Sequence, residues 1–421
     1  MTTTLEQPVV PQFRRTATSY PAWARWTLLA LLMLVLASIA RSVSGAGQVT
    51  SVGTFQAMVE YAVPIALAGL GGLWSERTGV VNIGLEGMMI FGTWGGAWGA
   101  LQFHNAWAGV LVGVGFGALG GLLHAVATVT FGVDHIVSGV AINILAPGVV
   151  RYLSGAIWAG SEGGGSTQSP FVTTSIGQFT IPGVSTFFRH VAEQNWFLVS
   201  DLAGLLGGFT SGVSWLTLVT IGLFVGSFVF FWRTRLGLRM RSVGENPIAA
   251  ESLGVKVYSM KYIGVIASGA LAGLGGAFLS LDASSIYREG QTSGRGFIGL
   301  AAVIFGNWRP GGLAAGSGLF GYASALQLRS GGAVHALLLF VALLLALVGV
   351  RHLLRRRWAG GALAMAAAIF FAVWYAATDA LPAEIISFTP HITTLLVLAV
   401  AAQRLRPPAW DGLPYRRGEA R

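Results

Sequence analysis

The sequence predicts an all-α membrane protein that crosses the bilayer many times. Only 10% of its 421 residues are charged, whereas roughly 25% are charged in an ordinary globular protein. Hydrophobic residues make up 54% of the chain and the mean hydropathy is +0.67, so a soluble fold would lack the polar groups to cover its surface. The apolar runs are long and unbroken rather than alternating, which excludes a transmembrane β-barrel.

Apolar runs long enough to form membrane-crossing helices recur along the chain. A transmembrane helix needs about 20 mostly apolar residues, and we expect about 10 to 12 segments, some of them short or broken. The run 297–328 is too long for one span, and Pro310, Gly311 and Gly312 interrupt it. Glycine-rich stretches let helices approach closely in lipid, so a dense bundle is expected. The runs are 26–40, 55–74, 86–103, 109–131, 136–158, 214–232, 262–281, 297–328, 334–350, 358–377 and 392–402.

The positions of the basic residues predict the orientation. Lys and Arg gather in cytoplasmic loops, so the net charge of +10 indicates topology rather than nucleic-acid binding. With the polar tail 1–22 in the cytoplasm, the loop 233–261, the cluster Arg351–Arg357 and the tail 404–421 all fall on the cytoplasmic side, and all are rich in Arg. The long loop 159–212 falls outside. Both termini are therefore expected in the cytoplasm, and the first apolar run is a retained helix rather than a signal peptide.

The apolar runs and the loops between them divide the chain into five predicted parts. The loops 159–212 and 233–261 lie within the core. The predicted parts are the N-terminal tail 1–22, the core 23–328, a transmembrane hairpin 329–380, a last helix 381–403 and the C-terminal tail 404–421.

The segment 75–87 places polar residues and three glycines between two apolar runs. It is either a cytoplasmic turn or a broken helix at membrane depth, where irregular backbone is tolerated only if it lines a cavity or is buried in protein. Asn82 and Glu86 are four residues apart, which on a helix puts them on one face. On the second interpretation they present hydrogen-bonding groups to a polar solute.

The segment 244–255 predicts a short helix between two spans. Asn246 suits an N-cap, Pro247 the first helical position and Gly254 the end. Ala249 and Ala250 would give it a small, smooth face. The helix is either a connector or a docking surface for a cytoplasmic partner.

Other polar residues give weaker signals. Arg295 either reaches a membrane interface or serves a function, since charges beside the bilayer are costly. Glu60, alone in an apolar run, is weak support for an ion or proton pathway. The chain has no Cys, no helical His pair suited to a metal, and no phosphate-binding loop ending in Gly-Lys-Ser/Thr. If ATP drives transport, another chain must hydrolyse it.

Several ordered motifs together resemble one family. They are 75–87, 133–146 (VDHIVSGVAINILA), 244–255, 294–310 (GRGFIGLAAVIFGNWRP) and 407–417 (PPAWDGLPYRR). The chain resembles permease subunits of bacterial ABC importers of the branched-chain amino acid and simple-sugar class, and most closely the nucleoside and simple-sugar branch. The resemblance implies a type II-like ABC importer permease bundle in the bacterial cell membrane.

The resemblance also implies partners and roles. The partners would be a second homologous permease, an ABC ATPase that uses ATP and Mg, an extracytoplasmic solute-binding lipoprotein and the lipid bilayer, with no nucleic acid. This chain would be a transport subunit rather than an enzyme, binding no cofactor or metal itself. Asn82, Glu86 and Asn143 would lie near the translocation path. The ATPase-coupling residues would be Gly244, Glu245, Asn246, Pro247, Ala249, Ala250 and Gly254.

Two features depart from the family pattern, and two other functions stay open. The hairpin 329–380 intervenes where the family usually runs quickly to its last helix, and we expect it at the periphery of the bundle. The outer loop 159–212 is long and is a candidate for docking the binding protein. The alternatives are a permease for another small polar solute, such as branched-chain amino acids, and an ATP-independent secondary transporter.

Overall fold

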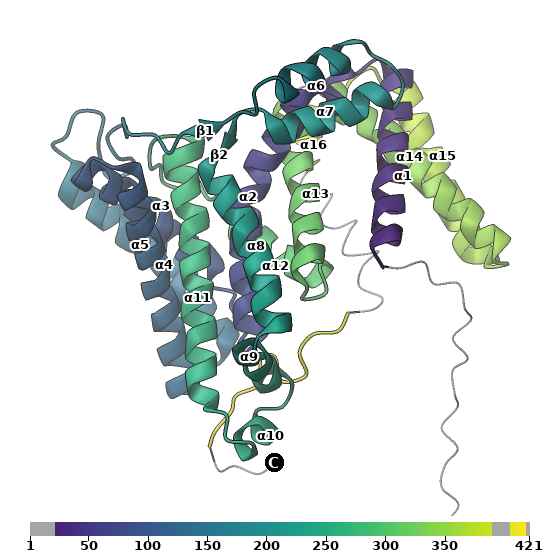
Figure 1. The fold of residues 1–421 in the computed structure, drawn as a ribbon. Helices are drawn as coiled ribbons and strands as arrows, with labels where there is room; N and C mark the ends of the chain where they lie inside the picture. The colour runs from purple at the N-terminus through teal and green to yellow at the C-terminus, as the bar shows by residue number, and fades with distance from the viewer. Residues whose placement is uncertain (1–21, 330, 390–404, 418–421) are drawn as a thin grey trace, which may run out of the picture.

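The computed structural model describes residues 22–329, 331–389 and 405–417, and these form a bundle of long helices (Figure 1). Seven described helices are long and apolar enough to cross a membrane, and two shorter apolar helices accompany them. This confirms the predicted all-α, multi-span fold class. Most of the predicted last helix, 381–403, lies outside the described residues. The bundle helices are α1 (Ala22–Ser44), α2 (Val52–Glu76), α3 (Leu85–Phe103), α4 (Ala106–Ala125), α5 (His135–Trp158), α8 (Trp215–Arg233), α11 (Val257–Phe278), α12 (Arg295–Phe305), α13 (Pro310–Arg329), α14 (Gly331–Leu354) and α15 (Trp358–Ala377).

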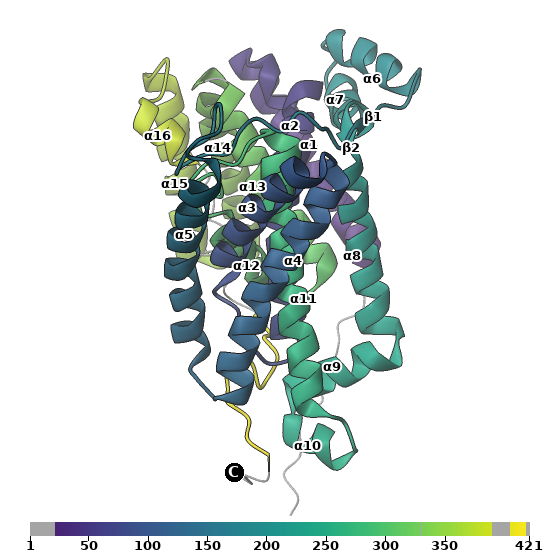
Figure 2. The same ribbon diagram turned by 90° about the vertical axis from the view of Figure 1, so that its left-hand side faces the viewer.

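The centre of the bundle is packed backbone against backbone. Helices α4 and α11 run side by side (Figure 2) and touch through glycines. A Cβ at Gly117 of α4 would lie only 2.3 Å from the carbonyl oxygen of Gly269 in α11. A Cβ at Gly276 would lie 2.1 Å from the carbonyl oxygen of Met89 in α3. Small residues therefore set the helix spacing, as predicted for association in lipid.

Short elements cover the two ends of the bundle. One end, called here the α10 end, carries α9 (Arg235–Glu245) and α10 (Pro247–Ser252). The opposite α7 end carries α6 (Val184–Glu193), α7 (Val199–Thr210) and a small antiparallel pair, β1 (Gln178–Phe179) with β2 (Val213–Ser214). The 3-10 turn η1 (Gly47–Thr50) precedes α2, and the π-helical turns η2 (Val126–Thr130) and η3 (Leu279–Ala283) extend α4 and α11. Helices thus occupy parts of both segments that the sequence analysis treats as loops, 159–212 and 233–261.

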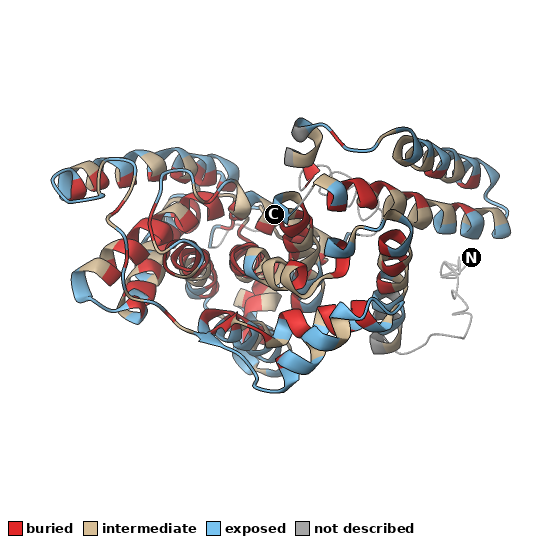
Figure 3. Cartoon of the chain, turned by 90° about the horizontal axis from the view of Figure 1, so that it is seen from above, coloured by how far each residue is buried: buried red, intermediate tan, exposed pale blue. Residues whose placement is uncertain are grey.

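Helices α14 and α15 form a hairpin at the side of the bundle (Figure 1). They meet closely, since a Cβ at Gly361 would lie 2.6 Å from the Leu353 side chain. Helix α15 has few buried residues, as the view from above shows (Figure 3), and α14 contacts α1. The short helix α16 (Ala383–Ser387) follows at the α7 end.

Candidate functional site

The break between α2 and α3 passes through the interior of the bundle. After a turn at 77–79 the chain is irregular over 80–82, where Val80 and Asn82 are fully buried. Its polar backbone groups find side-chain partners: Ser75 Oγ donates to the Val80 carbonyl at 2.6 Å, and His124 Nε2 lies 3.0 Å from the Val81 carbonyl. Irregular backbone without water needs such partners. The segment is therefore a turn followed by a buried break, which favours the broken-helix interpretation.

Asn82 and Asn143 hold this break in place. Asn82 donates from Nδ2 to Ser268 Oγ of α11 at 2.8 Å and accepts from the Gly84 amide at 3.0 Å. Asn143 of α5 accepts from the Gly87 amide at 2.7 Å and donates to the Ile83 carbonyl at 2.9 Å. The side-chain amides of Asn82 and Asn143 therefore each donate and accept a hydrogen bond within the protein.

The Glu86 carboxylate caps the N-terminus of α12. Its two carboxylate oxygens accept the backbone N–H groups of Gly294, at 2.9 Å, and Gly296, at 2.7 Å. A carboxylate suits this position because the first N–H groups of a helix lack intrahelical partners and carry partial positive charge. Asn82 precedes α3, which begins at Leu85, so the predicted arrangement of Asn82 and Glu86 on one helical face is wrong.

The three predicted path residues therefore gather around the start of α3 and join it to α5, α11 and α12. In the described structure their side chains form hydrogen bonds with backbone groups, and their contact with a solute stays a prediction. Arg295 lies beside them at the first position of α12. Its Nη1 donates to the carbonyls of Gln291, at 2.9 Å, and Thr292, at 3.2 Å. One turn on, Gly299 packs against Gly69 of α2, and Arg295 is half-buried. Whether Arg295 reaches a membrane interface or serves a function stays a prediction.

Helix α10 forms as the sequence predicts. The Asn246 side chain accepts the Ala249 amide at 2.9 Å, Pro247 is the first helical residue, and Gly254 adopts a φ of +80° just beyond the end. Its two alanines, however, differ in burial: Ala249 is exposed, whereas Ala250 is only 2% exposed. The predicted smooth face of two alanines is therefore wrong.

Two large apolar residues are exposed in this region. Ile248 is 37% exposed and Leu253, at the end of α10, is 84% exposed. Ala249 lies beside Ile248. This exposed pair was not predicted from the sequence, because the local pattern does not show which side of the six-residue helix is buried.

Gly244 and Glu245 connect α10 to the end of α2. A Cβ at Gly244 would lie 2.4 Å from the Arg77 carbonyl oxygen, so a glycine is needed for this approach. Glu245 lies 4.0 Å from the Arg77 guanidinium. Burial lowers the pKa of Arg77, and the Glu245 charge opposes that effect.

A second cluster, absent from the sequence analysis, joins α2 to the corner between α12 and α13. Arg77 Nε donates to the Trp308 carbonyl at 3.0 Å, and the Trp308 indole N–H donates to the buried Glu76 carboxylate. Asn307 and Trp308 both have positive φ, of 53°, so the corner is a tight left-handed turn. Glu76 and Trp308 are far apart in sequence, and only the fold brings them together.

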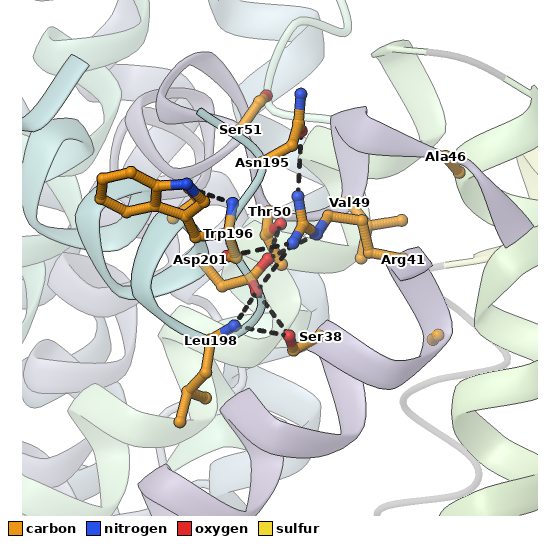
Figure 4. A network of polar contacts seen from close by, with 12 residues as sticks. Ser38, Arg41, Ala46, Val49, Thr50, Ser51, Asn195, Trp196, Leu198 and Asp201 are labelled. Carbon is orange, nitrogen blue, oxygen red and sulfur yellow. Dashed lines mark hydrogen bonds and ion pairs between the residues drawn. The ribbon is translucent and has the colours of Figure 1, made fainter. Parts of the chain in front are cut away.

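At the α7 end a buried ion pair fixes α7 to α1 (Figure 4). Asp201 is fully buried and lies 2.9 Å from Arg41 Nε, while Ser38 Oγ donates to it at 2.5 Å. The Thr50 hydroxyl and the Leu198 amide also donate to this carboxylate. A groove of about 420 Å³ opens beside the network, lined by Arg41, Ser51, Gln56, Arg189, Glu193 and Asn195, among others.

Glu60 of α2 lies near one other acidic residue. Glu60 and Asp282 line a small cavity of about 40 Å³, and Asp282 accepts the Ser214 hydroxyl at 2.7 Å. Among the residues that the structure describes, no group of three or more His, Cys, Asp or Glu side chains is arranged to hold a metal ion.

The fold and the buried breaks define an α-helical membrane protein whose helices are interrupted inside the bundle and which carries a short helix at one end. The chain belongs to the family described as the permease component of the branched-chain amino acid transport system, whose model matches residues 54–349. That match reaches into α14 and ends before α15. The predicted resemblance to ABC importer permeases is confirmed.

Several relatives share much of the chain. It is 38% identical to the guanosine ABC transporter permease protein NupQ of Bacillus subtilis over 278 residues, 65% of this chain and 81% of the relative. It is 30% identical to the nucleoside ABC transporter permease protein NupC of Lactococcus lactis over 367 residues, 85% of this chain and 95% of the relative. It is 35% identical to the putative glucose ABC transporter permease protein TsgC13 of Haloferax volcanii, over 66% of this chain and 78% of the relative. No solved structure matches the chain.

Proposed function

We propose that this chain is the membrane-spanning permease of an ATP-driven importer of nucleosides, with simple sugars as the second candidate solute. The observation that carries the proposal is the similarity to the nucleoside permease NupC, which extends over 95% of that protein. The guanosine permease NupQ supports nucleosides, and the glucose permease TsgC13 supports sugars.

The α10 end is the proposed ATPase-binding side. It combines the exposed apolar residues Ile248 and Leu253 with the Arg-rich segment 233–241, which favours a cytoplasmic position. A separate ATPase that uses ATP and Mg would dock there. Glu245 and Gly244 would pass its movement to Arg77 at the end of α2. Both termini then lie in the cytoplasm of a bacterial cell.

The α7 end would face the extracytoplasmic space and receive a solute-binding lipoprotein. Helices α6 and α7, fixed by the Arg41–Asp201 ion pair, give that end a defined surface. A second, related permease is expected beside this one. The similarity of this chain to both NupB and NupC, two nucleoside permeases of Lactococcus lactis, supports a pair of permeases.

The path itself would run near the break held by Asn82, Glu86 and Asn143. These residues would act on transport by fixing the start of α3 against α5 and α12. The branched-chain amino acid and secondary-transporter alternatives stay as outcomes of the test.

The test is uptake of radiolabelled guanosine, glucose and leucine by cells with and without this gene, beside a strain whose partner ATPase is inactive. We expect guanosine uptake to be lost in both the deletion and the ATPase-dead strain. Loss of glucose or leucine uptake alone would reassign the solute. Guanosine uptake that survives the dead ATPase but not the deletion would overturn the ATP-driven mechanism in favour of a secondary transporter.

A further inference from the structure

Residues 405–417, called here the C-terminal strap, lie across the α10 end of the bundle. Figure 1 shows the strap in yellow, running beneath the bundle and ending beside α10. It begins at the corner between α12 and α13, where the Arg406 amide donates to Asn307 Oδ1 at 2.8 Å. The strap therefore lies against the α12–α13 corner, about a hundred residues before it in the sequence, and against α10, which is farther still.

The middle of the strap is inserted between α9 and the α2–α3 break. The Trp410 amide donates to the Gly244 carbonyl at 2.8 Å, and a Cβ at Gly79 would lie 3.1 Å from the Trp410 carbonyl oxygen. Beside it, Lys261 Nζ donates to the Gly79 carbonyl at 3.1 Å and attracts the Asp411 carboxylate. The strap is thus packed against the same backbone that forms the break.

The end of the strap holds α10 itself. Tyr415 is buried, its ring lies 5.7 Å from that of Tyr258 in α11, and its hydroxyl donates to the Glu251 carboxylate. Arg417 pairs with the same carboxylate at 3.0 Å. Before α10, the Ala409 amide donates to the side chain of Glu245, the last residue of α9, at 3.2 Å. The strap is therefore bonded to the end of α9 and to Glu251 of α10.

A six-residue helix is too short to be rigid or stable alone, so its position depends on what holds it. We propose that the C-terminal strap is a positioning element that makes α10 move together with the α2–α3 break and the α12–α13 corner. Tyr415 and Trp410 are its positioning residues. This inference rests on the proposed function, because it assumes that an ATPase acts on α10.

The test uses the complete complex in proteoliposomes and measures guanosine transported per ATP hydrolysed. Tyr415→Ala should lower this ratio by about two- to thirtyfold, the range by which residues in coupling networks act, while ATP hydrolysis continues. Tyr415→Phe keeps the ring packing and should retain most of the ratio. A merely structural role would lower the amount of assembled complex but leave the ratio of the remaining complex unchanged, and that result would overturn the inference.

A charge exchange keeps the test decisive if Tyr415→Ala fails to assemble. Arg417→Glu and Glu251→Arg should each lower the ratio, and the double variant should recover it. Arg355→Glu, at an exposed position of the α14–α15 loop, is the matched control and should leave the ratio unchanged. No recovery in the double variant would contradict the Arg417–Glu251 ion pair as part of the attachment. If the wild-type complex transports no solute with ATP, it is the proposed function that fails.

Discussion

The Glu86 carboxylate and the Gly296 backbone are in direct contact, with the Gly296 amide donating to Oε2 at 2.7 Å. A Cβ at position 296 would lie 2.6 Å from the Glu86 Cα, so the two backbones approach as closely as a glycine permits. Because Glu86 belongs to the first turn of α3 and Gly296 to the first turn of α12, the contact ties the starts of two interrupted helices together. Neither helix can shift along the bundle without breaking it.

Replacing Glu86 should destabilise the bundle. Glu86→Ala removes two acceptors and leaves the half-buried Gly294 amide and the buried Gly296 amide without this partner, at a cost of about 2 kcal/mol or more. Glu86→Gln keeps one good acceptor and should lie between. Thermal unfolding of the purified protein in detergent measures the change, with the exposed Glu162→Ala of the outer loop as the control. Equal melting temperatures for the two alanine variants would contradict the role of Glu86.

The sequence predicted those helix ends that are determined by the residues at the ends themselves. Asn246, Pro247 and Gly254 specify the ends of α10 through their own backbone preferences, and the structure has that helix. The Pro310 break likewise separates α12 from α13. Spacing was misleading for Asn82 and Glu86, because an interval of four residues defines a common face only if both lie on one helix. Asn82 lies in the irregular segment before α3.

Long-range contacts explain what the sequence did not show. Ala250 faces inward because α9, α11 and the strap surround it, and nothing in the local pattern distinguishes it from Ala249. The Glu76–Trp308 bond joins residues at the ends of separate helices, and the position of Asp411 depends on the path of the strap. The motifs 75–87, 294–310 and 407–417 were predicted as separate signals, whereas they meet at the α10 end or at the buried break.

A glycine pair on α4 provides a test of the backbone packing. A Cβ at Gly117 would lie 2.3 Å from the Gly269 carbonyl oxygen, whereas a Cβ at Gly115 would meet nothing within 4 Å. Gly117→Ala should therefore destabilise the protein by about 1–3 kcal/mol through overpacking. Gly115→Ala should be neutral, or stabilising by about 0.5–1 kcal/mol, because alanine loses less entropy in a helix. Melting temperatures measured in one detergent compare the stability of the two variants. A Gly117→Ala protein as stable as Gly115→Ala would refute the close α4–α11 contact.

The attachment of the strap should weaken as the pH rises from about 4 to 7. Burial raises the pKa of Asp411 to about 7 from the ordinary 3.8, with the Lys261 charge and the Gly412 amide opposing. Between about pH 4 and 7, Asp411 is mostly protonated in the attached strap and mostly ionised in the free strap. Attachment is therefore strongest at low pH, weakens across this window and is constant above about pH 7. Hydrogen exchange of residues 405–417 measures it, compared at each pH with Asp411→Asn. The ratio of the two exchange rates should change across this window, and a constant ratio would contradict the shifted pKa.

Leu253 should be a main contact of the ATPase. It is 84% exposed at the end of α10, and an apolar side chain of this size is expected to be buried when the partner binds. Leu253→Ser should then weaken ATPase binding by about tenfold, because burying a leucine contributes about 1.5 kcal/mol or more. Leu354, at the end of α14, is 81% exposed and provides a matched control, since it lies in the hairpin away from α10. Binding of the purified ATPase to each variant in detergent gives the affinities. If Leu354→Ser weakens binding as much as Leu253→Ser, the ATPase contacts the hairpin as well and α10 is not its main docking surface; if neither does, the docking surface lies elsewhere.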